Sequence, residues 1–223
     1  LIDEDGNPEG GKLTFDTENR EKLPKDLELP ELEGAPSNEF VEEATEYVEK
    51  HFGENCGTTA EFFYPVTFED ADKWLDRFIE GKLSKFGPYQ DAIAKGERFL
   101  FHSVLTPMMN CGLLTPNQVV DRVLDFAESE DVPMNSLEGF IRQVIGWREF
   151  MRGIYCSIGR KQRSSNFFGH AHTLPECLWT GETGIDPVDD SIRNLLETGY
   201  SHHIERLMIL GNFMALTELD PEE

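Results

Sequence analysis

The chain has 223 residues, of which 39% are hydrophobic, and its 16 Phe and 3 Trp are enough to bury a core, which excludes a chain disordered throughout. A formal net charge of −23 argues against a surface that wraps nucleic acid unaided, because phosphate binding needs local positive potential. The sequence has no run of about 18 apolar residues and no signal-peptide pattern. We therefore expect no membrane association.

The first 36 residues carry Gly, Pro and charge with little periodicity, and Leu23, Leu29 and Ala35 each precede a proline. This pattern predicts an extended interdomain linker over residues 1–36. The pattern becomes helical from residue 37, so residues 37–223 are expected to form one helical domain.

Helical periodicity and capping signals predict most of the elements in this domain. Phe40, Val41, Ala44, Tyr47 and Val48 form an apolar stripe that stops at Gly53. Further helices are expected from Thr67 to Gly81, from Glu97 to Asn110 with Pro107 kinking or ending it, from Thr115, from Asn135 through Met151, and from Asp186. The last helix carries Leu207, Met208, Leu210, Met214 and Leu216 as its core stripe.

No segment alternates with period two for long enough to predict a sheet, so the fold class is all-α. The four cysteines are widely and irregularly spaced, and no histidine stands at zinc-ligand spacing. They are interpreted as reduced core thiols of an intracellular, cytoplasmic protein, and no metal site is predicted. The chain begins at Leu1 without a methionine, so we expect a fragment whose targeting segment cannot be observed.

Three groups of polar residues interrupt apolar helical patterns. His202, His203 and Arg206 precede the last apolar stripe, and His203 and Arg206 lie three residues apart on one face, where they can bind an anion and donate a proton. The alternative is that the histidines only cap neighbouring carbonyls.

The second group follows Phe140, where Arg142, Gln143 and Trp147 would suit a site that needs hydrogen-bond donors beside a flat ring. Arg148 and Glu149 can equally form an exposed charged pair. In the third group, Ser103 and Thr106 can donate to phosphate oxygens near a helix N-terminus, or serve only as helix caps.

Taken together, these motifs resemble the photolyase and cryptochrome family, and most closely its iron–sulfur bacterial branch, which contains prokaryotic (6-4) photolyases. The motifs are Gly11-Lys-Leu-Thr-Phe-Asp-Thr-Glu-Asn-Arg20, the Ser103 to Leu114 and Asn135 to Phe150 stretches, Gly153-Ile-Tyr155, Asn166-Phe-Phe168, Trp179-Thr-Gly181 and His202-His-Ile-Glu-Arg-Leu-Met208. The resemblance covers essentially the whole chain. It implies a linker and the first part of the helical FAD-binding domain.

The resemblance also implies an activity and the residues that carry it. In this family blue light drives an electron from reduced FAD into a pyrimidine dimer that is flipped out of the duplex, and the protein orients the cofactor and protonates the lesion. By match to the family motifs, Ser103, Leu105 and Thr106 would hold the FAD phosphates, with Tyr89 a weaker contributor. Gln143, Trp147 and Arg148 would line the flavin and lesion pocket. Arg206 would lie beside the flavin ring, His203 would donate a proton to the lesion with His202 as its packed neighbour, and Trp179 would belong to the electron-transfer route.

Two features depart from the family pattern. Pro187 stands where the iron–sulfur branch has its first cluster cysteine, so a cluster is not expected, and Cys177 is only a weak replacement. The second departure is the acidity, because a monomeric enzyme that binds damaged DNA needs a basic cleft. The basic concentration available for DNA consists of Arg142, Arg148, Arg152, Arg160, Lys161 and Arg163.

These observations predict a light-driven DNA photolyase, a carbon–carbon lyase that acts on (6-4) photoproducts, with the fragment alone inactive. The alternative is a cryptochrome-like blue-light photoreceptor that binds FAD and signals through partner proteins. The missing cluster cysteine and the acidic surface favour this alternative.

Overall fold

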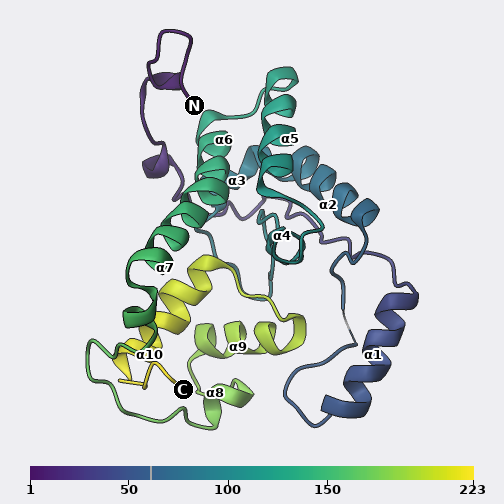
Figure 1. Cartoon of the computed structure of the whole chain (residues 1–223), viewed down its shortest axis with the longest axis vertical. Coiled ribbons are helices and arrows are strands. Elements are labelled where there is room, and N and C mark those ends of the chain that lie inside the picture. Colours follow the sequence, from purple (N-terminus) through teal and green to yellow (C-terminus); the bar gives the residue numbers. More distant parts are fainter. Residues whose placement is uncertain (61) are drawn as a thin grey trace. The chain divides into compact units, whose positions relative to one another are not determined.

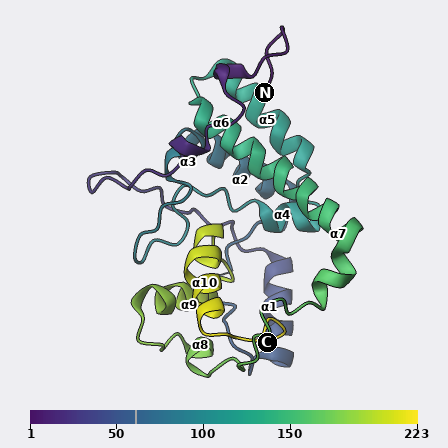
Figure 2. The same ribbon diagram turned by 90° about the vertical axis from the view of Figure 1, so that its left-hand side faces the viewer.

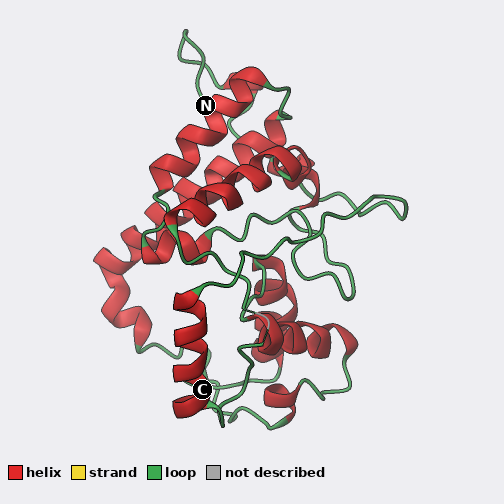
Figure 3. Ribbon diagram, turned by 90° about the vertical axis from the view of Figure 1, so that its right-hand side faces the viewer, coloured by secondary structure: helices red, strands yellow, loops and turns green. Residues whose placement is uncertain are grey.

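The computed structural model describes residues 1–60 and 62–223, and within these residues it contains helices and connecting loops but no β-strand (Figures 1 and 3). The predicted all-α class is therefore confirmed. The α-helices are α1 (Glu39–Phe52), α2 (Phe68–Gly81), α3 (Leu83–Tyr89), α4 (Thr106–Cys111), α5 (Pro116–Ser129), α6 (Met134–Ile141), α7 (Trp147–Arg163), α8 (Cys177–Thr180), α9 (Asp186–Thr198) and α10 (Asn212–Leu216). Two π-helical segments are η3 (Arg142–Gly146) and η4 (Glu205–Gly211), and two short 3₁₀ turns are η1 (Glu9–Gly11) and η2 (Asp16–Glu18).

The chain divides into two compact units, and it passes between them more than once. Unit 1 comprises Leu1–Pro36, Tyr64–Ala92 and Phe99–Cys156. Unit 2 comprises Ser37–Phe63, Ile93–Arg98 and Ser157–Glu223. The assignment of residues 1–36 to an interdomain linker stays a prediction, although these residues group with unit 1.

Unit 1 is built around helices α2, α3, α5 and α6, which lie against one another (Figure 2). The ring centroid of Phe140 in α6 lies 4.7 Å from that of Phe78 in α2 and 5.4 Å from that of Phe86 in α3. Helices α3 and α6 approach closely at Gly87, where a Cβ atom would lie 2.7 Å from the backbone nitrogen of Ser136. The Gly87 N–H also donates to the Ser136 hydroxyl at 2.9 Å, and this hydroxyl donates to the Ser84 carbonyl at 3.0 Å.

The N-terminal segment is anchored to the same unit. Phe15 and Asn19 are buried, and the Phe15 N–H donates to the Glu138 carboxylate at 3.2 Å. The Asn19 side-chain amide donates to the Asn135 carbonyl at 3.2 Å and packs against Gly139, where a Cβ atom would lie 2.8 Å from its nitrogen. The motif from Gly11 to Arg20 therefore reaches α6, the helix that leads into η3.

Unit 2 has a smaller core, formed by Leu178, Val188, Ile192, Leu210 and Leu219. Its helix α1 begins at the cap of Asn38, whose side chain accepts from the N–H groups of Phe40 and Val41. The apolar stripe predicted for this helix is correct in position, but α1 has no buried residue. Phe40 is 60% exposed and Tyr47 is 58% exposed.

Helix boundaries agree with the sequence where a side chain caps the first turn. Thr67 accepts from the Asp70 N–H at 3.1 Å at the start of α2, and Thr115 forms a full capping box with Gln118 before α5. Asp186, where the sequence predicts a helix to begin with a side-chain cap followed by proline, does not act as the cap. Ile185 is the N-cap and Asp186 is the first residue of α9. Here the carboxylate of Asp189 instead accepts hydrogen bonds from the N–H groups of Thr183 and Gly184 at 2.7 and 3.0 Å and from the Thr183 hydroxyl. The hydroxyl and the two N–H groups lower the pKa of Asp189.

The helix predicted from Glu97 to Asn110 is wrong. Residues up to Leu105 form an irregular loop, and Pro107 lies in the first turn of α4 instead of ending an earlier helix. The physical reason is that proline lacks an N–H and is tolerated at a helix start, where that donor has no partner. Helix α3 was not predicted, and the expected burial of the four cysteines is also wrong, because Cys56, Cys111 and Cys156 are exposed.

Candidate functional site

The loop before α4 is the most strained part of unit 1. Leu100 and Val104 both adopt left-handed backbone conformations, with φ values of 43° and 54°. This conformation is costly for a β-branched residue and is found where surrounding structure holds the backbone in place. The loop is held in part by the Trp74 indole N–H, which donates to the Ser103 carbonyl at 2.9 Å. The loop places Ser103 and Thr106 before and at the start of α4.

The residues predicted to bind a phosphate differ in accessibility. Thr106 is exposed and Ser103 is half-buried, so both hydroxyls can meet a ligand. Leu105 is 1% exposed, so only its backbone can contribute. The Tyr89 ring, at the end of α3, lies with its centroid 5.5 Å from that of Phe101 in the same strained loop.

The second group lies on η3 and the first turn of α7. The Gln143 side-chain amide donates to the buried Gln90 side chain at 3.4 Å, which joins η3 to the residue after Tyr89. The Arg148 guanidinium donates to the Val144 carbonyl at 3.0 Å and contacts the Met109 sulfur of α4 at 3.3 Å. These contacts join Arg148 to α4 and Gln143 to the residue after Tyr89, all within unit 1. Trp147 belongs to the same segment and is 45% exposed.

The third group belongs to unit 2. The chain leaves α9 at Gly199 and enters the next helical segment at His203, so the two histidines lie at the start of that segment. His202 is 2% exposed, whereas His203 and Arg206 are both exposed. Burial is the main reason that the pKa of His202 is lowered to about 4, with smaller effects from His203 and Arg206. His202 is therefore a neutral imidazole at pH 7, and the exposed face carries His203 and Arg206.

The second and third groups of polar residues lie on or next to the π-helical segments η3 and η4. Such segments are rare and often occur at functional sites. Each of the two ends on a glycine, and at Gly211 a Cβ atom would lie 2.8 Å from the Arg206 carbonyl oxygen. A glycine inside an apolar helical pattern was the sequence signal available for these irregularities.

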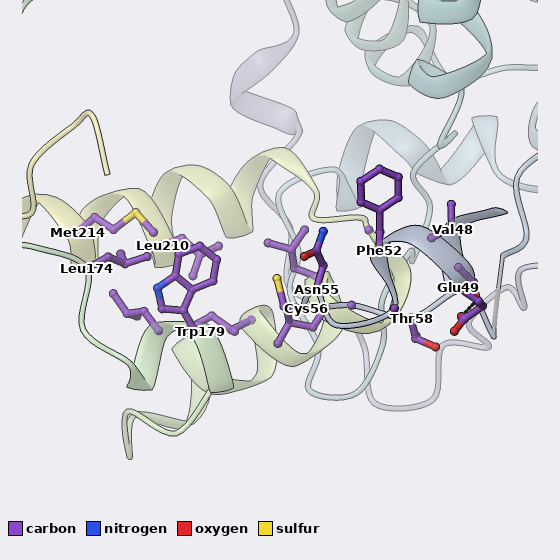
Figure 4. Close-up of a pocket in the computed structure, with 18 residues that line it drawn as sticks. Val48, Glu49, Phe52, Asn55, Cys56, Thr58, Leu174, Trp179, Leu210 and Met214 are labelled. Atoms are coloured by element: carbon purple, nitrogen blue, oxygen red, sulfur yellow. Dashed lines mark hydrogen bonds between the residues drawn. The ribbon is translucent and has the colours of Figure 1, made fainter. Parts of the chain in front are cut away.

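Trp179 lies on α8, where it is 52% exposed. It lines a cavity of about 790 Å³ within unit 2. Figure 4 shows its indole beside Leu174, Leu210 and Met214, with Asn55, Cys56 and Thr58 farther along the cavity. Of the residues predicted for the site, only Trp179 lines this cavity.

The predicted DNA-contacting residues do not form one free basic patch. Arg142 is paired with Glu138 at 2.9 Å and with Asp16 at 3.1 Å, and Arg152 is paired with Glu149 at 3.2 Å. Arg160, Lys161 and Arg163 are exposed in the last turn of α7. Among the described residues, no group of His, Cys, Asp and Glu could hold a metal ion, and no helix is long and apolar enough to cross a membrane.

Two residues with clear structural roles near these groups were not singled out from the sequence. Glu205 is buried beside His202, and Gln90 is buried beside Gln143. Glu205 stands three residues after His202, which is the spacing of a capping box and was a usable signal. No sequence pattern around Gln90 indicates that it packs beside Gln143.

Three known proteins or protein families that resemble this chain are photolyases or their relatives, or match one half of it. The family described as "Deoxyribodipyrimidine photo-lyase-related protein" matches residues 1–64. A (6-4) photolyase of Agrobacterium fabrum is 40% identical over 215 residues, which is 96% of this chain and 42% of that protein. An uncharacterized protein, R853, of Acanthamoeba polyphaga mimivirus is 42% identical over 114 residues, covering 51% of this chain and 87% of that protein.

A solved structure shares the fold. The class III photolyase of Agrobacterium tumefaciens superposes with a TM-score of 0.58 at 20% sequence identity, covering 83% of this chain and 35% of that structure. The chain thus spans less than half the length of the photolyases that it matches. Identity of 40% along nearly the whole chain confirms the resemblance found in the sequence motifs. The chain belongs to the deoxyribodipyrimidine photolyase-related family.

Proposed function

We propose that this chain is part of a light-driven DNA repair flavoprotein that acts on (6-4) photoproducts. The observation that carries the proposal is the 40% identity, over 96% of the chain, to a protein named (6-4) photolyase. The chain also presents an exposed histidine and arginine three residues apart, which is the chemistry needed to bind an anionic lesion and donate a proton to it.

We propose that the hydroxyl donors before and at the start of α4 hold the phosphates of FAD. Ser103 and Thr106 supply accessible hydroxyls at the start of α4. Gln143, Trp147 and Arg148 would line the ring and lesion pocket, and Arg206 would add a fixed positive charge. When bound, FAD would supply the light-driven electron that splits the lesion.

His203 is the residue proposed to donate the proton. It is exposed, whereas His202 is buried and neutral, so only His203 can meet a substrate directly. His202 would hold its neighbour in position. Trp179, which is half-exposed on α8, is proposed to pass electrons between the protein surface and the cofactor.

Damaged DNA is proposed to contact the end of α7. Arg160, Lys161 and Arg163 lie there without an ion pair among the described residues, so their charge is available to phosphates. Arg142 and Arg152 are neutralised by carboxylates and would contribute less.

The test is repair of a (6-4) photoproduct in a short duplex under blue light, with FAD content read from the visible spectrum. Wild-type protein at its natural termini should bind FAD and repair the lesion. His203→Ala should keep FAD and lose at least about 100-fold in repair, the range typical of a general acid. Undiminished repair by His203→Ala would refute its role, and absence of flavin in the wild type would refute the flavoprotein proposal.

A cryptochrome-like photoreceptor is the second candidate function. The net charge of −23 favours it, because a strongly acidic surface opposes DNA binding. Photoreducible flavin without repair of either a (6-4) photoproduct or a cyclobutane dimer would support this candidate over the first.

A further inference from the structure

The turn that carries the two histidines is held by one buried carboxylate. Glu205 is 5% exposed, and its Oε2 atom accepts from the His202 backbone N–H at 3.2 Å and from the Ser201 hydroxyl at 3.3 Å. Its Oε1 atom lies 3.7 Å from His202 Nε2. One side chain therefore contacts both the backbone and the ring of His202.

The other end of the turn is also fixed. The Thr198 hydroxyl accepts from the Tyr200 N–H at 3.1 Å, and the Gly199 N–H donates to the Leu195 carbonyl at 2.8 Å. Residues 199–202 thus run between two anchors, Thr198 at the end of α9 and Glu205 at the start of η4. Since successive residues at a helix start point about 100° apart, holding His202 in the core directs His203 outward.

A buried carboxylate is a costly way to hold a turn. Burial raises the pKa of Glu205, and the nearby Asp190 adds to this rise, while the His202 N–H and the Ser201 hydroxyl oppose it. The other ionisable groups nearby are Asp190 on α9 and, one and two residues away in sequence, Arg206 and His203. The two hydrogen bonds that the carboxylate accepts, from the His202 N–H and the Ser201 hydroxyl, offset part of its lost hydration.

We propose that Glu205 is the positioning residue of the histidine turn, holding His202 inside unit 2 so that His203 and Arg206 face the substrate. This inference rests on the proposed function for its consequence in repair, but not for its structural content. The sequence motif assigned roles to His202, His203 and Arg206 and left Glu205 as an intervening residue.

The experiment compares Glu205→Gln with Glu205→Leu in the protein at its natural termini. Gln keeps an acceptor oxygen and the side-chain length, whereas Leu keeps volume and removes both acceptors. Asp190→Asn is the matched control, because it removes a neighbouring carboxylate without touching the turn.

The first readout is hydrogen exchange at the His202 backbone amide, which does not depend on any activity. Glu205→Leu should lose at least tenfold in protection there, while Glu205→Gln and Asp190→Asn should stay near the wild-type value. Equal protection in Glu205→Leu would overturn the structural part of the inference.

The second readout is repair at saturating FAD. Glu205→Leu should lose at least tenfold in repair with FAD still bound, and Glu205→Gln should restore most of it. Loss of amide protection with full repair would overturn the role in positioning His203. If the wild type neither binds FAD nor repairs DNA, the proposed function fails, and the exchange measurement alone still decides whether Glu205 holds the turn.

Discussion

At the scale of single residues, burial lowers the pKa values of two basic side chains, His202 and Lys82. His202 is buried with its pKa lowered to about 4, and Lys82, between α2 and α3, is buried with its pKa lowered to about 8. In both cases loss of hydration is the main cause. The Lys82 amine also has no hydrogen-bond partner among the described residues.

Lys82 should make unit 1 more stable as the solution becomes more alkaline. Its pKa is about 8 in the folded chain and about 10.5 when unfolded, so between these values the unfolded chain holds more protons and stability rises with pH. Below pH 8 the folded chain carries the full free-energy cost of burying the protonated Lys82 amine. Lys82→Met should remove this cost and add about 3 kcal/mol to the free energy of unfolding at pH 7. Denaturant unfolding at pH 7 and pH 9.5 checks both statements.

The matched control for this measurement is Lys25→Met, which changes an exposed lysine of the same unit. It should leave the free energy of unfolding within about 0.5 kcal/mol of the wild type. A Lys82→Met protein that is less stable than the wild type at pH 7 would show that the amine is partnered in solution.

At the scale of elements, close backbone contacts decide which helices pair. Helix α3 has only seven residues and contains Pro88, so it has little intrinsic helical stability. It is held by α6 through Gly87, where the two backbones approach too closely for a side chain. The Ser136 hydroxyl bridges the same contact.

Gly87→Ala should therefore destabilise unit 1 by about 1–3 kcal/mol, the usual cost of forcing extra atoms into a packed core. The added Cβ would meet the Asn135 carbonyl oxygen at 2.8 Å, and backbone cannot move aside as a flexible side chain can. The melting temperature of the variant, followed by circular dichroism, measures this effect.

Gly153→Ala provides the contrast, because a Cβ atom at Gly153 in α7 would meet no heavy atom within 4 Å apart from its chain neighbours and the nearby backbone of its own helix. This substitution should stabilise the helix by about 0.5–1 kcal/mol through helix propensity alone. Similar melting temperatures for the two variants would contradict the packing argument at Gly87.

Element boundaries also show where sequence reasoning succeeds and fails. The caps at Thr67 and Thr115 act within four residues, so they are visible in the sequence and the helices begin where predicted. The last apolar stripe was predicted with a period of 3.6, but η4 has wider i→i+5 turns. As a result Leu210 is buried, whereas Leu207 and Met208 are 52% and 58% exposed.

At the scale of the whole molecule, the dominant physical feature is charge. The net charge of −23 produces self-repulsion that favours expansion of the chain. Most of the ion pairs are exposed, for example Lys95 with Asp186 and Lys73 with Glu69, and exposed pairs contribute little.

Added salt should consequently raise the melting temperature. Raising NaCl from 0.05 to 1 M shortens the screening length to about 3 Å and should weaken the repulsion more than the exposed pairs. In a chain of this size, each increase of about 1 kcal/mol in the free energy of unfolding raises the melting temperature by about 2–4 °C. KCl should give the same result as NaCl, and a fall in melting temperature with either salt would mean that ion pairs outweigh repulsion.

The sequence by itself determined the all-α class, the helices with local caps and the membership of a photolyase-related family. These properties depend on short-range patterns and sequence motifs, which can be recognised without knowledge of the tertiary packing. Only the tertiary structure decided that Leu105 is buried beside exposed Thr106, that His202 faces the core while His203 faces outward, and that Glu205 holds that turn. Burial and the two π-helical segments depend on contacts between residues far apart in the chain and on backbone packing against glycine, and neither leaves a periodic signal in the sequence.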